Sequence, residues 1–258
     1  MNDKHLAANL SGPWLFAHRG YSKLAPENTL AAFRLARERG IPGIELDVRL
    51  CATGEMVVFH DDSLKRICGV EKTVEELSFG ALRELDAGIW KDPSFKGEPV
   101  PLLSEVFETL GPEMILDIEI KSSSGNAAPQ AAVLAELIQR HGMEKRCLVS
   151  SFNPLAVKSF RKVLPGIPTA VIYCHASGVP WYLRRGEGRL ISGCALLKPD
   201  HKQVTPLFMA YHGRLEGYQV LPWTVDDPAV AERLLKAGVR GIISNDPGPM
   251  KPLFGLTE

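Results

Sequence analysis

Short apolar segments alternate with helix-like segments along most of this chain of 258 residues. The helix-like segments have apolar residues at helical spacing and often end at a glycine, as 28–39 does at Gly40 and 227–237 does at Gly238. Strands joined through helices run parallel, because a parallel pair needs a long crossover connection. Eight such units of about 32 residues match the usual repeat of a closed (β/α)8 TIM barrel. The strands are expected at 14–18, 43–50, 114–121, 146–152, 168–173, 193–198, 218–225 and 240–244.

The alternative α/β architecture is an open, doubly wound sheet. A Gly-x-Gly-x-x-Gly loop after the first strand would favour that fold, and the sequence has no such loop there. No linker, low-complexity stretch or repeat divides the chain. We therefore expect a single barrel domain over 1–258.

One long segment, 51–113, interrupts the alternation between the second and third expected strands. It contains a hairpin-like turn at 53–55, an extra short strand at 56–59 and a loop-rich part at 86–101. We interpret it as a small insertion at the end of the barrel where the loops of barrel enzymes form the active site. It either shapes a substrate pocket or has no role, and we favour the first interpretation.

The charge and composition of the chain limit its function. Lys plus Arg and Asp plus Glu both number 30, so the formal net charge is zero, and a general nucleic-acid binder would need a basic face. No apolar run approaches the roughly 20 residues that cross a bilayer, and no basic amphipathic helix offers a membrane-docking surface. We expect a small soluble substrate, with no nucleic acid and no membrane insertion. The oligomeric state is left open.

The cysteines and the N-terminal segment favour a cytoplasmic protein. The five cysteines are widely spaced, which is typical of reduced thiols rather than of a disulfide framework or a thiolate zinc site. Segment 1–11 has no apolar stretch of signal-peptide length.

Carboxylates interrupt the second and third expected strands in a regular way. Glu45 and Asp47 share one face of the second strand, because residues two apart on a strand point the same way. Asp117, Glu119 and Lys121 share a face of the third strand. Buried carboxylates are costly unless they are paired or bind a metal. Glu45, Asp47 and Glu119 are therefore candidate ligands of a hard divalent cation, Mg²⁺ or Ca²⁺.

A layer of salt bridges inside the barrel is the alternative interpretation of these charges. It would pair Glu119 with Lys121, or Glu45 with Arg19. If only one strand carried such charges, the salt-bridge interpretation would explain them as well as a metal site would. The repetition of the pattern on two adjacent strands, at the active-site end, favours the metal site.

Two histidines are placed at the same end of the expected barrel. His18 ends the first strand and His60 ends the extra strand. A lone histidine at a strand end is more often structural or exposed than catalytic. Together with a hard metal, Arg19 and Lys121, however, this pair suggests phosphoryl transfer or phosphodiester hydrolysis. We assign no role to the other histidines.

In these residues the sequence resembles the glycerophosphodiester phosphodiesterases, in particular their short cytosolic bacterial branch. The resemblance extends from about Trp14 to Pro247, and the ordered set of motifs is far more specific than any one of them. The motifs are His18-Arg19-Gly20, Ala25-Pro26-Glu27-Asn28-Thr29, Glu45-Leu46-Asp47-Val48, His60-Asp61-Asp62, Val100-Pro101-Leu102-Leu103-Ser104-Glu105-Val106, Glu119-Ile120-Lys121, Ser151-Phe152, Trp223-Thr224-Val225 and Gly241-Ile242-Ile243.

The resemblance implies a (β/α)8 barrel that hydrolyses glycerophosphodiesters, such as glycerophosphocholine, to sn-glycerol 3-phosphate and an alcohol. It implies one divalent cation and a catalytic histidine pair. The implied site consists of metal ligands Glu45, Asp47 and Glu119, catalytic His18 and His60, phosphate-binding Arg19 and Lys121, and the pocket residue Trp223. The chain departs from the family pattern at 244–247 and at 198–201, which bears on substrate shape more than on the chemistry.

Several points remain open at this level. The same chemistry could act on lysophospholipids or another phosphodiester. A non-catalytic phosphodiester-binding barrel and a metal-free barrel enzyme rank lower.

By analogy with related barrels, we favour His18 as the base and His60 as the acid. For 27–29, one interpretation is capping of the following helix by Asn28 or Thr29, and the other is hydrogen bonding of Glu27 or Asn28 to the metal or its ligands. We favour a supporting role outside the catalytic set.

Overall fold

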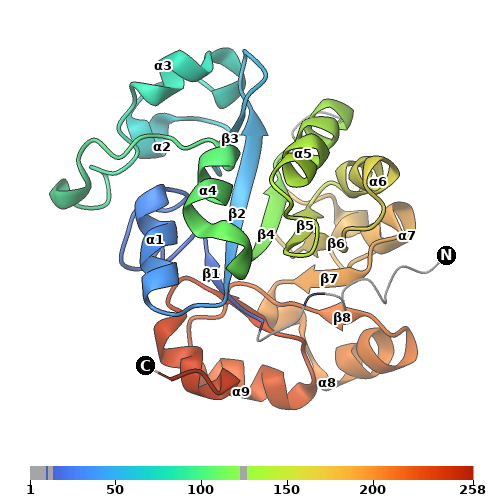
Figure 1. Ribbon diagram of the computed structural model, residues 1–258. Coiled ribbons are helices and arrows are strands. Elements are labelled where there is room, and N and C mark those ends of the chain that lie inside the picture. Colours follow the sequence, from blue (N-terminus) through green and yellow to red (C-terminus); the bar gives the residue numbers. More distant parts are fainter. Residues whose placement is uncertain (1–9, 11–13, 123–126, 258) are drawn as a thin grey trace.

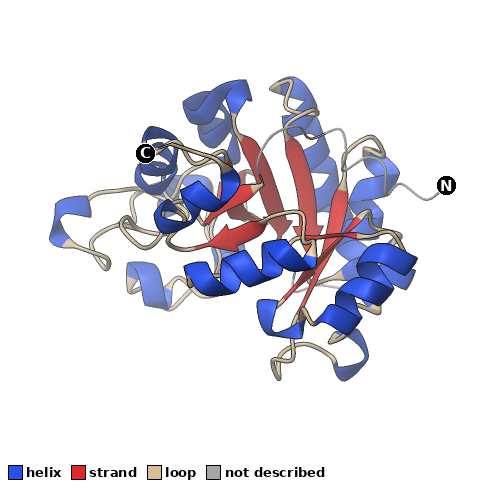
Figure 2. Cartoon of the chain, turned by 90° about the horizontal axis from the view of Figure 1, so that it is seen from below, coloured by secondary structure: helices blue, strands red, loops and turns tan. Residues whose placement is uncertain are grey.

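The computed structural model describes residues 10, 14–122 and 127–257. At its centre lies a curled sheet of parallel strands with helices along its outer side (Figures 1 and 2). The strand order is β8-β7-β6-β5-β4-β2-β1-β9, and β3 pairs antiparallel with β2. The strands are β1 (Leu15–His18), β2 (Gly43–Leu50), β3 (Met56–Val58), β4 (Ile115–Ile120), β5 (Cys147–Ser151), β6 (Thr169–Tyr173), β7 (Leu196–Pro199), β8 (Gln219–Val220) and β9 (Ile242–Ser244).

Backbone hydrogen bonds link the two ends of this strand order. The amide of Arg240 donates to the carbonyl oxygen of Val220 over 2.8 Å, just before β9 begins. The amide of Ile243 donates to Pro222 at 3.1 Å, and the amide of Val225 donates to Ile243 at 2.9 Å. The parallel α/β sheet expected from the sequence is present, although the seventh expected strand, 218–225, is regular only over β8.

The helices follow the strands as the sequence pattern predicts. Thr29 caps α1 by accepting a hydrogen bond from the amide of Ala32, so this helix begins two residues later than the expected start of 28–39. The α-helices are α1 (Leu30–Glu38), α2 (Lys65–Cys68), α3 (Phe79–Arg83), α4 (Leu103–Leu110), α5 (Ala128–Arg140), α6 (Pro154–Val163), α7 (Gly188–Ser192), α8 (Pro206–Phe208) and α9 (Pro228–Ala237). Among the described residues, no helix combines the length and apolar character needed to cross a bilayer.

The two faces of the sheet carry different side chains. Ile44, Leu46 and Val48 of β2 are completely buried in the main core against the helices. The inner face has a smaller apolar cluster that includes Trp14 and Phe16, which lie at the start of β1. This cluster fills the interior near the amino ends of the strands, so the polar side chains of the inner face are confined to the carboxyl ends.

Segment 51–113 lies beside the carboxyl end of β2 and contains α2 and α3 (Figure 1). The extra strand expected at 56–59 is present as β3, which pairs with the end of β2. The segment has an apolar cluster of its own around Val57, Leu64 and Val74. Because His60 follows β3, this packing holds His60 next to the end of β2.

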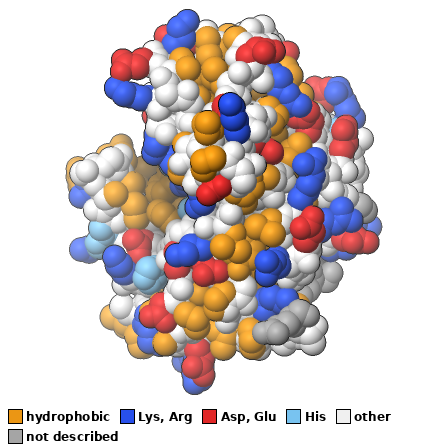
Figure 3. Space-filling view, turned by 90° about the vertical axis from the view of Figure 1, so that its left-hand side faces the viewer, with side chains coloured by type: hydrophobic (Ala, Val, Ile, Leu, Met, Phe, Trp, Pro, Cys, Tyr) orange, Lys and Arg blue, Asp and Glu red, His pale blue; other side chains and the backbone are white. Residues whose placement is uncertain are grey.

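Acidic and basic side chains are interspersed on the face of the molecule seen in Figure 3, with hydrophobic side chains exposed between them. This mixture agrees with the zero net charge of the sequence.

Segment 1–11, in which no apolar stretch of signal-peptide length was found, lies outside the described residues except for Leu10.

Candidate active site

Three buried carboxylates meet on the inner face of the sheet. Asp47 of β2 is paired in register with Glu119 of β4, and Glu45 lies two residues before Asp47 on the same face. These three residues are at most 5% exposed. One carboxylate oxygen from each residue lies within 4.8 Å of the others. Such an all-oxygen set suits a hard divalent cation, so these residues fit the metal expected from the sequence.

The positive charges nearby balance this carboxylate cluster only in part. The Nζ atom of Lys121 lies 2.6 Å from Glu119 Oε1 and 3.1 Å from Asp47 Oδ1. Burial opposes ionisation of Asp47, but Lys121 and Arg19 outweigh it and hold its pKa well below the usual range. Burial and the charge of Asp47 raise the pKa of Glu45 well above its usual range. Glu45 is thus the carboxylate that most needs a further cation.

His18 presents one ring nitrogen to the carboxylates and the other to Asn245. Its Nδ1 atom lies 2.7 Å from Asn245 Oδ1. The Asn245 amide is oriented by Asp226, which accepts hydrogen bonds from its Nδ2 at 2.7 Å and from its backbone amide at 2.8 Å. Nδ1 of His18 must therefore carry the proton, which leaves the lone pair on Nε2, 3.8 Å from Glu45 Oε2.

The electrostatic surroundings of His18 also favour the neutral ring. Burial, aided by the positive charge of Arg19, lowers the pKa of His18 to about 4. At neutral pH the Nε2 atom can therefore accept a proton.

His60 is oriented by the residue that follows it. Its Nδ1 atom lies 2.7 Å from Asp61 Oδ1. Burial opposes ionisation of Asp61, but hydrogen bonds from Arg66 and His60 outweigh it and lower its pKa to about 2. An ionised Asp61 accepts the Nδ1 proton, so Nε2 is the ring atom of His60 available for proton transfer.

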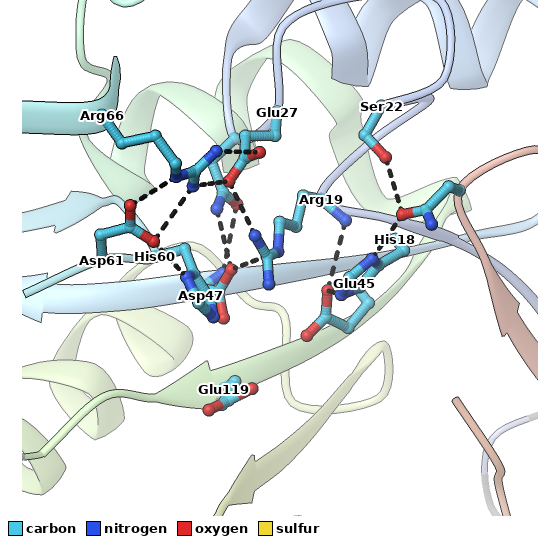
Figure 4. A network of polar contacts seen from close by, with 12 residues as sticks. His18, Arg19, Ser22, Glu27, Glu45, Asp47, His60, Asp61, Arg66 and Glu119 are labelled. Atoms are coloured by element: carbon cyan, nitrogen blue, oxygen red, sulfur yellow. Dashed lines mark hydrogen bonds and ion pairs between the residues drawn. The ribbon is translucent and has the colours of Figure 1, made fainter. Parts of the chain in front are cut away.

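Arg66 of α2 joins His60 to the loop after β1 (Figure 4). Its guanidinium binds both oxygens of Asp61, at 2.6 and 3.0 Å, and both oxygens of Glu27, at 3.0 and 2.7 Å. Glu27 in turn accepts a hydrogen bond from Arg19 at 2.7 Å, and Arg19 Nε lies 3.4 Å from Asp47 Oδ2. A continuous network of ion pairs therefore connects the acidic residue beside His60 with the carboxylate cluster.

The loop after β1 is held in an unusual backbone conformation. Arg19 and Asn28 have positive φ angles of 55° and 57°. Asn28 donates to Asp47 Oδ2 at 2.8 Å and accepts from the amide of Asp47 at 3.3 Å. Gly20 between them has a φ of 80°, and a Cβ there would lie 2.7 Å from that of Ala32. Of the residues considered at 27–29, Thr29 caps the helix, and Asn28 forms hydrogen bonds with the candidate metal ligand Asp47.

These side chains surround a cavity of about 280 Å³ at the carboxyl ends of the strands. The indole of Trp223 lies on one wall, where it donates to the carbonyl oxygen of Lys198 at 3.0 Å and packs edge-on against Phe152. Asp47 does not line the cavity itself but contacts Arg19 and Lys121, which do. The residues that line the cavity are His18, Arg19, Glu45, His60, Glu119, Lys121, Phe152, Ile172, Lys198, Trp223 and Ile243.

Lys198 is a residue of this cavity that the sequence analysis did not identify. It is completely buried, and its Nζ atom lies 2.5 Å from Asp117 Oδ2 and 2.9 Å from Ser150 Oγ. Asp117 shares a strand face with Glu119 but is engaged by this lysine. The only sequence feature that could have indicated a role for Lys198 is its position as a charged residue at the end of an apolar segment. Asn245, Asp226 and Arg66 gave no such signal, because each is one of many polar residues in loops or on exposed helix faces.

A curled parallel sheet with carboxylates, histidines and cationic side chains at its carboxyl end fits the class of hydrolases that act on phosphodiesters. The sequence model of the Glycerophosphoryl diester phosphodiesterase family matches residues 18–249 of this chain. The chain therefore belongs to that family.

Individual relatives agree with this assignment. A glycerophosphodiester phosphodiesterase of Caldanaerobacter subterraneus subsp. tengcongensis is 36% identical over 90% of this chain and 94% of its own length. Putative glycerophosphodiester phosphodiesterase YhdW of Bacillus subtilis is 33% identical over 91% of this chain and 95% of its own. An Oleispira antarctica phosphodiesterase, solved in complex with the product sn-glycerol-3-phosphate, superposes with a TM-score of 0.85 at 30% identity, covering 96% of this chain and 98% of that one.

Proposed function

We propose that this protein hydrolyses glycerophosphodiesters to sn-glycerol 3-phosphate and an alcohol with the help of one divalent cation. The observation that carries the proposal is the meeting of Glu45, Asp47 and Glu119 within 4.8 Å beside two histidines with oriented rings. Family membership and the product-bound relative support the choice of substrate.

The proposed architecture is the complete (β/α)8 barrel as one domain over 1–258, with 51–113 inserted between the second and third parallel strands. The hydrogen bonds between the two ends of the strand order support closure. The position of His60 after β3 supports a role of this segment in forming the pocket. The cytoplasmic location stays a prediction from the sequence.

In this proposal Glu45, Asp47 and Glu119 hold Mg²⁺ or Ca²⁺. The bound cation supplies positive charge beside the phosphoryl oxygens, where negative charge increases during the reaction. Arg19 and Lys121 line the same cavity and bind the remaining phosphate oxygens. Trp223 and Phe152 form the apolar wall against the organic part of the substrate.

His18 serves as the general base and His60 as the general acid. The unprotonated Nε2 of His18, kept available by the Asn245 hydrogen bond, takes a proton from the attacking oxygen. His60 faces the same cavity and adjoins a second cavity of about 460 Å³. It donates the Nε2 proton to the leaving alcohol, while Asp61 stabilises the positive charge of the ring.

The first experiment measures glycerol 3-phosphate released from glycerophosphocholine by the purified protein, with and without chelator. We expect activity that chelator abolishes and added Mg²⁺ or Ca²⁺ restores. No release under any metal condition, or full activity in excess chelator, would contradict the proposal.

The roles of the histidines are tested with two leaving groups. Each proton transfer is worth about 10²–10⁴ in rate. Replacing His60 with Ala should therefore slow glycerophosphocholine cleavage far more than cleavage of a nitrophenyl phosphodiester, whose leaving group needs no proton. Replacing His18 with Ala should slow both about equally. The opposite pattern would exchange the two roles.

A further inference from the structure

Large hydrophobic side chains are exposed around the loops that follow β6 and β7. Trp181 is 78% exposed and Tyr182 is 54% exposed, and their rings contact each other edge-on. Leu207 of α8 is 79% exposed, and Tyr211 one turn later is 47% exposed. Isolated exposed apolar residues are ordinary, but a gathered set is typical of an interaction surface.

These side chains come from two neighbouring loops, and those of the second loop line a groove together with Arg185 of the first. The loop after β6 and helix α8 border the same groove, of about 780 Å³, which Arg185, Lys202, Leu207 and Tyr211 line together. The side chain of Gln203 donates to the carbonyl oxygen of Arg184 at 2.9 Å, which ties the two loops to each other. We call Trp181, Tyr182, Arg185, Lys202, Leu207 and Tyr211 the docking surface.

Two exposed basic side chains border the groove, which the carboxylate of Asp200 also lines. The side chains of Arg185 and Lys202 are exposed and form no ion pair with any described residue. The neighbouring acidic side chains accept hydrogen bonds from backbone amides: Glu187 from the amide of Arg185 and Asp200 from that of Lys202. Two cationic side chains are thus free to bind an anionic partner next to the aromatic rings.

The groove of the docking surface and the catalytic cavity adjoin opposite sides of β6. On β6, Ile172 lines the catalytic cavity and the next residue, Tyr173, lines the groove. The backbone of Trp223, whose indole lines the catalytic cavity, accepts a hydrogen bond from the amide of His201 at 2.9 Å. Both features are lined by residues at or just beyond the carboxyl ends of β6 and β7.

We propose that the docking surface binds peripherally to the surface of an anionic phospholipid bilayer. Tryptophan and tyrosine favour the membrane–water interface, leucine enters the apolar layer, and arginine and lysine bind acidic head groups. Binding through this surface would bring the loops after β6 and β7 to the lipid. The sequence analysis expected no such surface, since no single helix is both basic and amphipathic; here a loop and a separate helix combine to form it.

The test is co-sedimentation of the full chain with phosphatidylcholine vesicles that contain or lack phosphatidylglycerol. We expect binding to the anionic vesicles only, with weaker binding at high salt. Each of Arg185→Gln and Lys202→Gln should lower the partition coefficient about fivefold. Trp181→Ser and Leu207→Ser should each lower it about tenfold.

Matched controls come from the C-terminal end of helix α6, outside the docking surface. Val163 is 51% exposed there, so Val163→Ser removes an exposed apolar side chain, and Lys162→Gln removes an exposed charge. Both controls should bind vesicles as the parent does. All these variants should keep their activity on soluble glycerophosphocholine, which separates this proposal from the proposed function.

Three results would overturn the proposal. The first is no binding to either kind of vesicle. The second is equal loss in the docking-surface variants and the controls. The third is a dimer in solution that Leu207→Ser dissociates, because this would assign the surface to a second copy of the chain.

Discussion

The ring of His18 is held by Asn245, with 2.7 Å between Nδ1 and the amide oxygen. Asn245 is itself fixed by the carboxylate of Asp226, so the tautomer of a histidine at the end of β1 is decided by residues beyond β8 and β9. The pairing of β1 with β9 brings Asn245 beside His18, and the backbone hydrogen bonds between β9 and the segment after β8 bring Asp226 beside Asn245.

The first prediction follows from this hydrogen bond. Asn245→Ala should lower kcat on glycerophosphocholine by about 10–100-fold, because His18 loses the partner that fixes its proton on Nδ1. The matched control is Ser22→Ala, since the Ser22 hydroxyl donates to the same Asn245 oxygen at 3.1 Å without touching His18. Steady-state kinetics should give near-normal turnover for the control. Equal activity of the two variants would contradict the role of Asn245.

The second prediction concerns Arg66, which contacts Asp61 and Glu27 but not the cavity. Arg66→Gln should slow cleavage of glycerophosphocholine by about tenfold or more, because Asp61 is no longer held against His60. Cleavage of a nitrophenyl phosphodiester should change little, and Arg66→Lys should recover part of the loss.

Arg83 provides the control for Arg66. It forms a two-point ion pair with Glu105 in the same long segment, far along the chain from His60. Arg83→Gln should affect both substrates alike. If the two arginine variants gave the same leaving-group dependence, Arg66 would have only a structural role.

The third prediction addresses the carboxylate cluster. Glu45→Gln keeps the side-chain shape but removes one buried charge, so it should abolish metal-dependent activity without unfolding the protein. Mg²⁺ or Ca²⁺ should raise the melting temperature of the parent protein, because a ligand that binds only the folded state stabilises it. Thermal scans with and without the ion should reveal no such shift in Glu45→Gln. A shift of the same size in both proteins would place the ion elsewhere.

The fourth prediction is about stability. Lys198→Met should lower the free energy of unfolding by about 3–5 kcal/mol, because it leaves the completely buried Asp117 without its ion-pair partner. The double variant Lys198→Met with Asp117→Leu should recover much of this loss. Urea unfolding monitored by circular dichroism measures both. If the double variant were no more stable than the single one, the loss would come from packing rather than from the unpaired charge.

The sequence was sufficient to predict the features of the fold that depend only on residues near each other along the chain. Alternation along β2 puts Glu45 and Asp47 on one face and Ile44 and Leu46 on the other, and the structure confirms this division. The ends of helices could be predicted in the same way, because a glycine after a helix and a polar residue before it act locally. The parallel α/β sheet then follows from the order of strands and helices, because crossover connections determine strand direction.

The partners of the site residues were decided only by the tertiary structure. Asp117 and Glu119 look equivalent on their strand, yet Asp117 pairs with Lys198 from β7, while Glu119 joins Glu45 and Asp47. Asn245, Asp226 and Arg66 are ordinary polar residues in the sequence, and the exposed side chains around Trp181 come from separate elements. Spacing along a chain specifies which way a side chain points, but the curvature of the sheet and the packing of its loops determine which side chain it meets.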